Sequence, residues 1–282
     1  MHPLPLQGWN ADVIVDADGA QGGDLAFDPV GSAWTWFETG WSERPDGLPA
    51  GRSFTSESNP EILYQLQPAR ADNCLYLPFP AFYEGRFEAT GALSLTVPAE
   101  LRRLAILASS FGGGGEGELT LHFEDGTSHR MTYSSEDWWT NDDRSAPFGI
   151  SGLGRMGKPT GDQTYHSGRD FGFGLYETVI DLEQLQLSDR HLLSMEFNKT
   201  AGDGTGIFAI SGEYAELQPA RLQMGYHVQW TDHRKDFDLE TATAADGPWM
   251  PYLGTIQTVS GQHSALMDLS ERFKLFRLVR ED

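Results

Sequence analysis

The chain has 282 residues, of which 39% are hydrophobic and 12% aromatic, so it can bury a core and is not a disordered tail. Acidic residues outnumber basic ones by 41 to 20, and the net charge of -21 argues against nucleic acid and anionic membrane surfaces as partners. No apolar stretch has the length of a transmembrane helix, and the first residues lack the basic and apolar pattern of a signal peptide, so we expect neither membrane insertion nor a leader in this sequence.

Carboxylates gather in a glycine-rich segment near the start of the chain. Oxygen-rich loops suit calcium, although the spacing here is not that of an EF-hand. We therefore expect no cofactor other than, at most, a structural calcium ion. Its predicted ligands are Asp12, Asp16, Asp18 and Asp24.

Tryptophans begin to cluster at Trp34 and Trp36. Their spacing of two puts both rings on one face of an extended segment. Indoles offer flat apolar faces on which the C–H faces of sugars stack, so the pair predicts either a sugar-binding platform or a part of the core. The only cysteine, Cys74, follows in a strand-like apolar run and is expected to be a small core side chain.

The strongest local signal is a hairpin over residues 118–133, in which apolar and polar side chains alternate on both sides of Asp125-Gly126. A turn of two residues would place His122 opposite His129, on the face that the apolar side chains leave free. Two imidazoles could hold a metal ion, but no third ligand is identifiable, and an exposed pair is the simpler interpretation. A bulged turn would change this register.

Short strand-like runs separated by glycine-rich and proline-rich breaks recur along the chain, while helical periodicity is scarce. Many short strands with regular turn signals predict an all-β fold, built as a sandwich or barrel. The runs lie at residues 92–97, 101–108, 176–182, 191–197 and 206–210.

The longest break, residues 137–170, is glycine-rich and polar and opens with Trp138-Trp139. Adjacent residues of an extended segment point to opposite faces, so at most one of these rings can face solvent and the other belongs to the core. A loop of this length in a compact domain is either functional or poorly ordered. The carboxylates that flank the tryptophan pair, among them Glu136 and Asp137, are most simply interpreted as solvated loop charge.

Near residue 218 the strand pattern starts again. We therefore predict a large β-sandwich over residues 1–217 and a small C-terminal β-module over residues 218–282. Strands of the module are expected at residues 225–230, 237–240, 255–259, 264–269 and 273–279.

Several short sequence motifs of residues 1–217 match a pattern of exported bacterial polysaccharide-processing proteins. They are NADVI at 10–14, FD at 27–28, DNCL at 72–75, FEDGT at 123–127, SEDWW at 135–139 and IFAI at 207–210. With them this part resembles galactose-binding-like jelly-roll domains, which implies a jelly-roll sandwich and sugar binding. Residues 34–52 and 140–170 match no part of the pattern, so the binding face could differ.

The C-terminal part resembles the small β-modules that end similar exported proteins. The matching words are FDLETA at 237–242, GPWMP at 247–251 and FRL at 276–278. The resemblance implies a fibronectin type III-like module with an architectural role.

Our main hypothesis is a secreted or cell-surface, monomeric protein that binds a polysaccharide or oligosaccharide without catalysis, with stacking indoles and polar side chains that orient hydroxyl groups. The alternative is a polysaccharide hydrolase or lyase with Glu136 and Asp137 as its carboxylate pair, because glycoside hydrolysis uses two carboxylates about 5–9.5 Å apart. A third possibility is a purely architectural spacer. The predicted ligand contacts are Trp34, Trp36, Asp137, Trp138, Trp139, Asn141 and Arg144.

Overall fold

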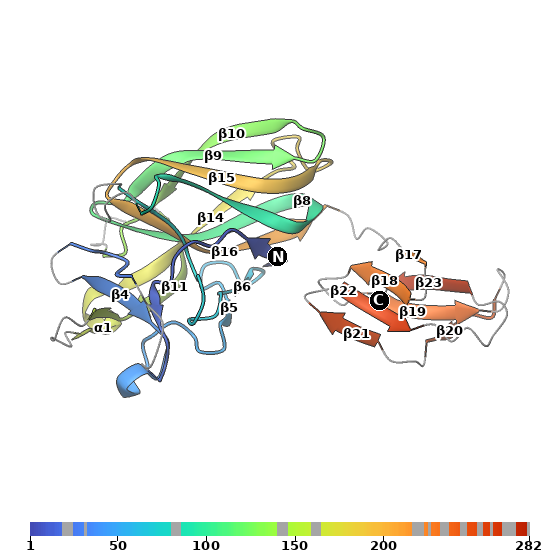
Figure 1. Cartoon of the computed structure of the whole chain (residues 1–282), viewed down its shortest axis with the longest axis horizontal. Coiled ribbons are helices and arrows are strands. Elements are labelled where there is room, and N and C mark those ends of the chain that lie inside the picture. Colours follow the sequence, from blue (N-terminus) through green and yellow to red (C-terminus); the bar gives the residue numbers. More distant parts are fainter. Residues whose placement is uncertain are drawn as a thin grey trace. The chain divides into compact units, whose positions relative to one another are not determined.

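The computed structural model divides into two compact units, Met1–Ala215 and Glu216–Asp282 (Figure 1). The boundary expected from the sequence, before residue 218, lies two residues after this division and outside the described residues. In the first unit the structure describes residues 1–18, 25–30, 33–79, 86–139, 146–158 and 165–215. In the second it describes residues 223–224, 227–231, 237–242, 247–252, 256–259, 262–266 and 275–280.

The first unit is a β-sandwich, as the sequence predicted, and one long strand, β8 (Thr90–Phe111), belongs to both of its sheets. The first sheet adds β2 (Leu6–Gln7), β15 (His191–Ala201), β9 (Gly115–Phe123) and β10 (Ser128–Ser135). The second sheet adds β11 (Phe148–Leu153), β14 (Phe173–Asp181), β16 (Gly204–Tyr214), β7 (Leu75–Pro78) and β1 (His2–Pro3).

The strand β8 changes partners halfway along its length. Residues 90–100 pair with β15. Residues 101–111 pair with β16 on one side, and residues 103–108 also pair with β14 on the other. The sequence predicted two separate strands here. Pro98, which has no backbone N–H to donate, lies where the pairing with β15 is irregular, and the chain continues through this point as one strand.

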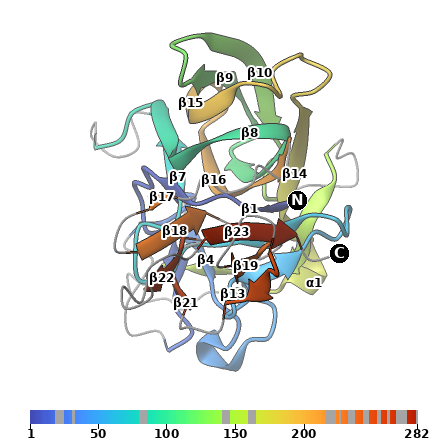
Figure 2. The same ribbon diagram turned by 90° about the vertical axis from the view of Figure 1, so that its right-hand side faces the viewer.

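A third layer covers the outer face of the second sheet (Figures 1 and 2). Its main part is a small sheet, and a hairpin, a 3-10 turn and one helical turn complete it. These elements are β3 (Ile14–Val15), β4 (Trp34–Phe37), η1 (Trp41–Glu43), β5 (Ser53–Thr55), β6 (Leu63–Gln65), β12 (Arg155–Gly157), β13 (Tyr165–His166) and α1 (Gly168–Phe171).

Because the second sheet is covered on both faces, its strands are apolar on both sides. In β8, Leu104 and Ile106 enter the core between the two sheets, while Ala105 and Leu107 enter a second core beneath the third layer. Cys74 is fully buried in the second core, as predicted.

The turn between β9 and β10 is one residue longer than the two-residue turn that would place His122 opposite His129. Gly126 has a φ of 81° and donates to the carbonyl of Phe123, so three residues form the turn and His122 lies opposite Ser128. His129 lies opposite Leu121 instead, and His122 is 3.5 Å from Glu196. The pairing of the two histidines was therefore wrong. The predicted alternation in β9 is confirmed, since its inward side chains are buried.

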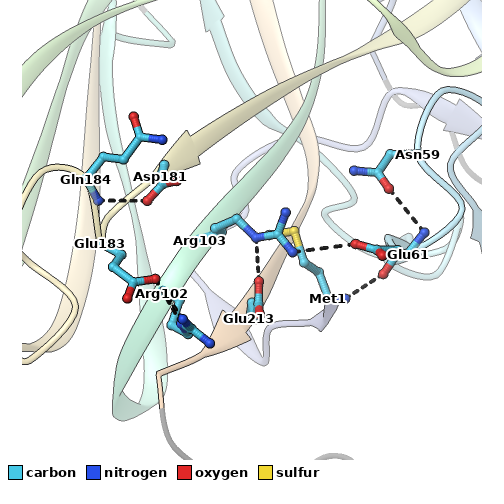
Figure 3. A network of polar contacts seen from close by, with 9 residues as sticks. All are labelled: Met1, Asn59, Glu61, Arg102, Arg103, Asp181, Glu183, Gln184 and Glu213. Atoms are coloured by element: carbon cyan, nitrogen blue, oxygen red, sulfur yellow. Dashed lines mark hydrogen bonds and ion pairs between the residues drawn. The ribbon is translucent and has the colours of Figure 1, made fainter.

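A polar network ties the N-terminus to the second sheet (Figure 3). The amino group of Met1 donates to the carbonyl of Glu61 at 2.5 Å, and the Glu61 carboxylate lies 3.6 Å from Arg103 on β8. Arg103 also pairs with Glu213 on β16, and the neighbouring Arg102 pairs with Glu183 at 2.8 Å. These contacts fix the start of the chain against the strands that support the third layer.

The second unit contains a four-stranded and a three-stranded sheet. Its described core consists of Trp230, Leu239 and Ala265, with Tyr252 and Phe276 packed against it. The four strands are β17 (Gln223–Met224), β18 (His227–Thr231), β22 (Gln262–Leu266) and β21 (Ile256–Val259). The three are β20 (Met250–Pro251), β19 (Phe237–Ala242) and β23 (Leu275–Arg280).

Candidate functional site

A buried arginine surrounded by aromatic rings lies at the junction of the third layer and the second sheet. Arg155 is 2% exposed, and its guanidinium carbon lies 4.5 Å from the ring centre of Trp34 and 4.5 Å from that of Phe173. The rings of Trp139 and Trp138 are at 4.7 and 5.0 Å. Cations attract the negative faces of aromatic rings, most strongly where water is excluded. We refer to Arg155, Trp34, Trp138, Trp139, His166, Phe171 and Phe173 together as the Arg155 cluster.

Four segments that are far apart in the sequence build this cluster. Trp34 and Arg155 come from the paired strands β4 and β12. The segment of Trp138 and Trp139 is fixed to the end of β8, because Ser110 donates to the carbonyl of Glu136 at 2.9 Å and its own carbonyl accepts from Trp138 at 2.7 Å.

The outer rim of the cluster is also aromatic. The His166 ring lies between Trp34 and Phe171, with ring centres 4.1 and 4.6 Å away. Trp139 packs edge-on against Phe171 at 5.8 Å and leaves 48% of its surface exposed. The cluster therefore presents one large indole to solvent, and the rings beneath hold that indole in place.

A hydrogen bond fixes the protonation of His166. Arg155 Nε donates to His166 Nδ1 at 3.3 Å, so Nδ1 must carry a lone pair and the neutral ring bears its hydrogen on Nε2. Burial, and then the nearby charge of Arg155, lower the pKa of His166 below its ordinary value of 6.5. The imidazole therefore contributes a neutral flat face at neutral pH.

Carboxylates balance the charge of Arg155. Burial lowers the pKa of Arg155 to about 10, while the charges of Asp28 and Asp137 oppose that shift, so the guanidinium remains protonated at neutral pH. Burial raises the pKa of Asp28, and the charges of Asp137 and Asp203 add to this rise. The Val30 amide and Arg155 act in the opposite direction.

The two carboxylates of the predicted catalytic pair both bind backbone amides. Asp137 accepts from Gly113 N at 2.6 Å and from Trp139 N at 2.8 Å. Glu136 accepts from Ala146 N at 3.3 Å. In these contacts both side chains position loops around the cluster, and their use as a catalytic pair stays a prediction.

The structure separates the predicted tryptophan contacts into core and surface residues. Trp138 is 1% exposed and Trp139 is 48% exposed, so the prediction that only one of them faces solvent is confirmed. Trp36 is fully buried and meets Trp138 edge-to-face at 4.9 Å. The prediction that Trp36 and Trp138 contact a ligand was therefore wrong, because neither ring has a face open to solvent. Trp34 keeps 9% exposure beneath His166.

The other predicted site residues lie away from the cluster or outside the described residues. Asn141 and Arg144, predicted as polar ligand contacts, belong to the latter group, as does Asp24. Sequence reasoning missed Arg155, because nothing near it in the sequence indicates a site. It also missed Phe171 and Phe173, although their spacing of two could have indicated a second aromatic pair.

The predicted calcium ligands that are described have partners within the protein. Asp16 accepts from Arg70 Nε at 2.7 Å, and Asp18 accepts from the same guanidinium. Asp12 accepts from Asn73 Nδ2 at 2.6 Å. Among the described residues no group of three or more histidine, cysteine or acidic side chains is arranged to hold a metal ion. With Asp24 outside that set, the calcium site stays a prediction.

Comparison of the sequence with family models and with curated proteins gives no match. Within the described parts of the chain, no helix has the length and apolar character that a membrane crossing requires. The function is therefore inferred from the residues of the site.

Proposed function

We propose that the first unit binds carbohydrate without catalysis and that Trp139 is the surface on which a sugar ring stacks. The observation that supports this most is the exposure of Trp139, at 48%, beside aromatic rings that are buried or half-buried. An indole that is held before the ligand arrives loses little conformational entropy on binding. Phe171, Phe173 and Arg155 hold the ring, and its own amide is bonded to Asp137.

Polar groups beside this indole suit a hydroxylated ligand. Asp137 is two residues from Trp139, and each of its carboxylate oxygens has further lone pairs besides those that accept from Gly113 and Trp139. A sugar hydroxyl can donate to them while its ring lies on the indole. The net charge of -21 repels anionic glycans, so we propose a neutral polysaccharide or oligosaccharide as the ligand.

Affinity electrophoresis of the full chain through gels containing neutral or acidic polysaccharides tests this proposal, and a glycan array extends the panel. We expect retardation by at least one neutral polysaccharide, and bound oligosaccharide should protect one indole from quenching by acrylamide. The Trp139→Ala variant should lose both effects. Trp249→Ala is the matched control, because Trp249 is a partly exposed indole of the second unit that also stacks on an arginine, Arg277, at 4.5 Å.

A polysaccharide hydrolase or lyase is the alternative, and one observation favours it. Asp28, whose pKa is raised by burial, lies within electrostatic reach of Asp137. Two carboxyl groups with such different environments are typical of an acid and base pair. Release of reducing ends or unsaturated products from a polysaccharide panel, abolished in Asp28→Asn and in Asp137→Asn, would favour catalysis over binding alone. Glu136→Gln tests the pair suggested by the sequence.

The wider setting is also a proposal. On the resemblance of its sequence motifs, we propose that the first unit is a galactose-binding-like jelly-roll domain of a secreted or cell-surface bacterial protein, and that the protein is monomeric. The second unit is a fibronectin type III-like spacer. Its four-stranded and three-stranded sheets support that assignment, because seven strands in two such sheets are the layout of immunoglobulin-like sandwiches.

A further inference from the structure

A pocket of about 280 Å³ lies at the turn between β15 and β16, outside the Arg155 cluster. It is lined by Phe79, by Ala89 and by the five residues from Lys199 to Asp203. Pockets for small organic ligands begin at about 300 Å³. This pocket is slightly smaller, which limits its ligand to about the size of one sugar ring.

The pocket combines an exposed ring with a buried cation. Phe79 is 54% exposed, and its amide donates to the carbonyl of Asp203 at 2.6 Å, which anchors the aromatic residue to the pocket wall. Lys199 is 7% exposed, and its Nζ donates to the carbonyl of Gly202 at 2.5 Å and lies 5.5 Å from the Phe79 ring centre.

The polar groups of the pocket have unused hydrogen-bonding capacity. An ammonium has three donors, and within the described chain Lys199 Nζ uses one of them, on Gly202. The Asp203 carboxylate receives no hydrogen bond from the residues that the structure describes, although its charge acts on Lys199. A donor, an acceptor and an exposed ring in one small pocket match the hydroxyl groups and the C–H face of a pyranose. The opposite charges of Lys199 and Asp203 favour a neutral ligand.

The pocket and the Arg155 cluster meet at one glycine turn. Gly113 N donates to Asp137 beside Trp139, and the neighbouring Gly112 lies against Asp203. Gly112 has a φ of 73°, and a Cβ on it would lie 2.2 Å from Asp203 Oδ2, so the turn needs glycine at this position.

From this juxtaposition we infer that the pocket of Phe79, Lys199 and Asp203 is a second sugar subsite, and that the ligand is an oligosaccharide chain engaging both this pocket and Trp139. The inference rests on the proposed function, since it extends the same ligand across the Gly112–Gly114 turn. A protein with a single stacking site binds a long oligosaccharide with little more affinity than a short one. With two subsites, the affinity rises when the oligosaccharide becomes long enough to reach both.

The test is a titration of the full chain with oligosaccharides of increasing length from the polysaccharide that binds it, followed calorimetrically and by backbone amide NMR shifts. We expect a stepwise rise in affinity with length and shifts at Gly202 and Asp203 with the longer chains. Phe79→Ala should weaken binding of those chains about tenfold, the size of one stacking contact, and Phe79→Trp should retain it. Leu193→Ala, an exposed apolar position on the same strand as Lys199, is the control.

The outcomes separate the two proposals. Length-dependent affinity that Phe79→Ala removes and Leu193→Ala preserves supports the second subsite. Binding that depends on Trp139, with equal affinity in Phe79→Ala and no shift at Gly202 or Asp203, overturns the subsite and leaves the proposed function standing. No affinity and no shifts with any glycan overturn both.

Discussion

Replacing each of the adjacent residues Trp138 and Trp139 by alanine should destabilise the first unit to different extents. Trp138 is 1% exposed, and loss of such a core ring costs about 3–5 kcal/mol, because a cavity remains. Trp139 is 48% exposed. Half of an indole buries about 100 Å², worth up to about 2.5 kcal/mol, and solvent fills the space that it leaves. We therefore expect Trp139→Ala to cost about 1–2 kcal/mol and Trp138→Ala about 1–4 kcal/mol more.

Urea unfolding followed by near-ultraviolet circular dichroism measures this difference. The two units can unfold separately, so the transition of the first unit has to be fitted on its own. Trp249→Ala identifies the transition that belongs to the second unit. Equal losses for Trp138→Ala and Trp139→Ala, or a larger loss for Trp139→Ala, would refute the assignment of one ring to the core and the other to the surface.

Three further changes test the electrostatics and the polar core. Burial raises the folded pKa of Asp28 above 3.8, its value in the unfolded chain. The wild type therefore loses stability as the pH rises from the unfolded to the folded pKa of Asp28. Asp28→Asn should therefore gain stability relative to the wild type as the pH rises above 3.8 in urea titrations, and a stability difference that does not change with pH would contradict the raised pKa of Asp28. The folded pKa of His166 is lowered, so the unfolded chain takes up its proton first and stability falls as pH drops through 6.5. This loss of stability at low pH should be smaller in His166→Gln. The same dependence of stability on pH in both proteins would contradict a neutral His166 ring. Tyr133 is 6% exposed, and its hydroxyl has no hydrogen-bond partner among the described residues, so Tyr133→Phe should raise the free energy of unfolding by about 1 kcal/mol. A loss of stability would show that the hydroxyl is satisfied.

The sequence predicts the all-β class and many of the strands well, because alternation and turn chemistry are local properties. The hairpin of β9 and β10 is an example. Its inward face follows directly from the alternation, while the register depended on one further turn residue, Glu124, before Asp125 and Gly126. Likewise Trp138 and Trp139 divide between core and surface as predicted, although they lie in a bend and not in a strand.

The site was harder to predict, because it is formed by contacts between distant segments. Arg155 lies in a short strand whose neighbours give no sign of an aromatic cluster, and its rings come from β4, β14 and the segment after β10. The burial of Trp36 depends on the second sheet being covered on both faces, which the spacing of two residues cannot indicate. Phe79 and Lys199 are 120 positions apart in the chain and meet only through the fold.

The most direct test of the central proposal is a calorimetric titration of wild type, Trp139→Ala and Trp249→Ala with the neutral polysaccharide that retards the wild type. We expect wild type and Trp249→Ala to bind with the same affinity, and Trp139→Ala to bind at least about tenfold more weakly while it remains folded. Binding by Trp139→Ala with the affinity of the wild type would contradict the proposal that this indole is the sugar-stacking surface.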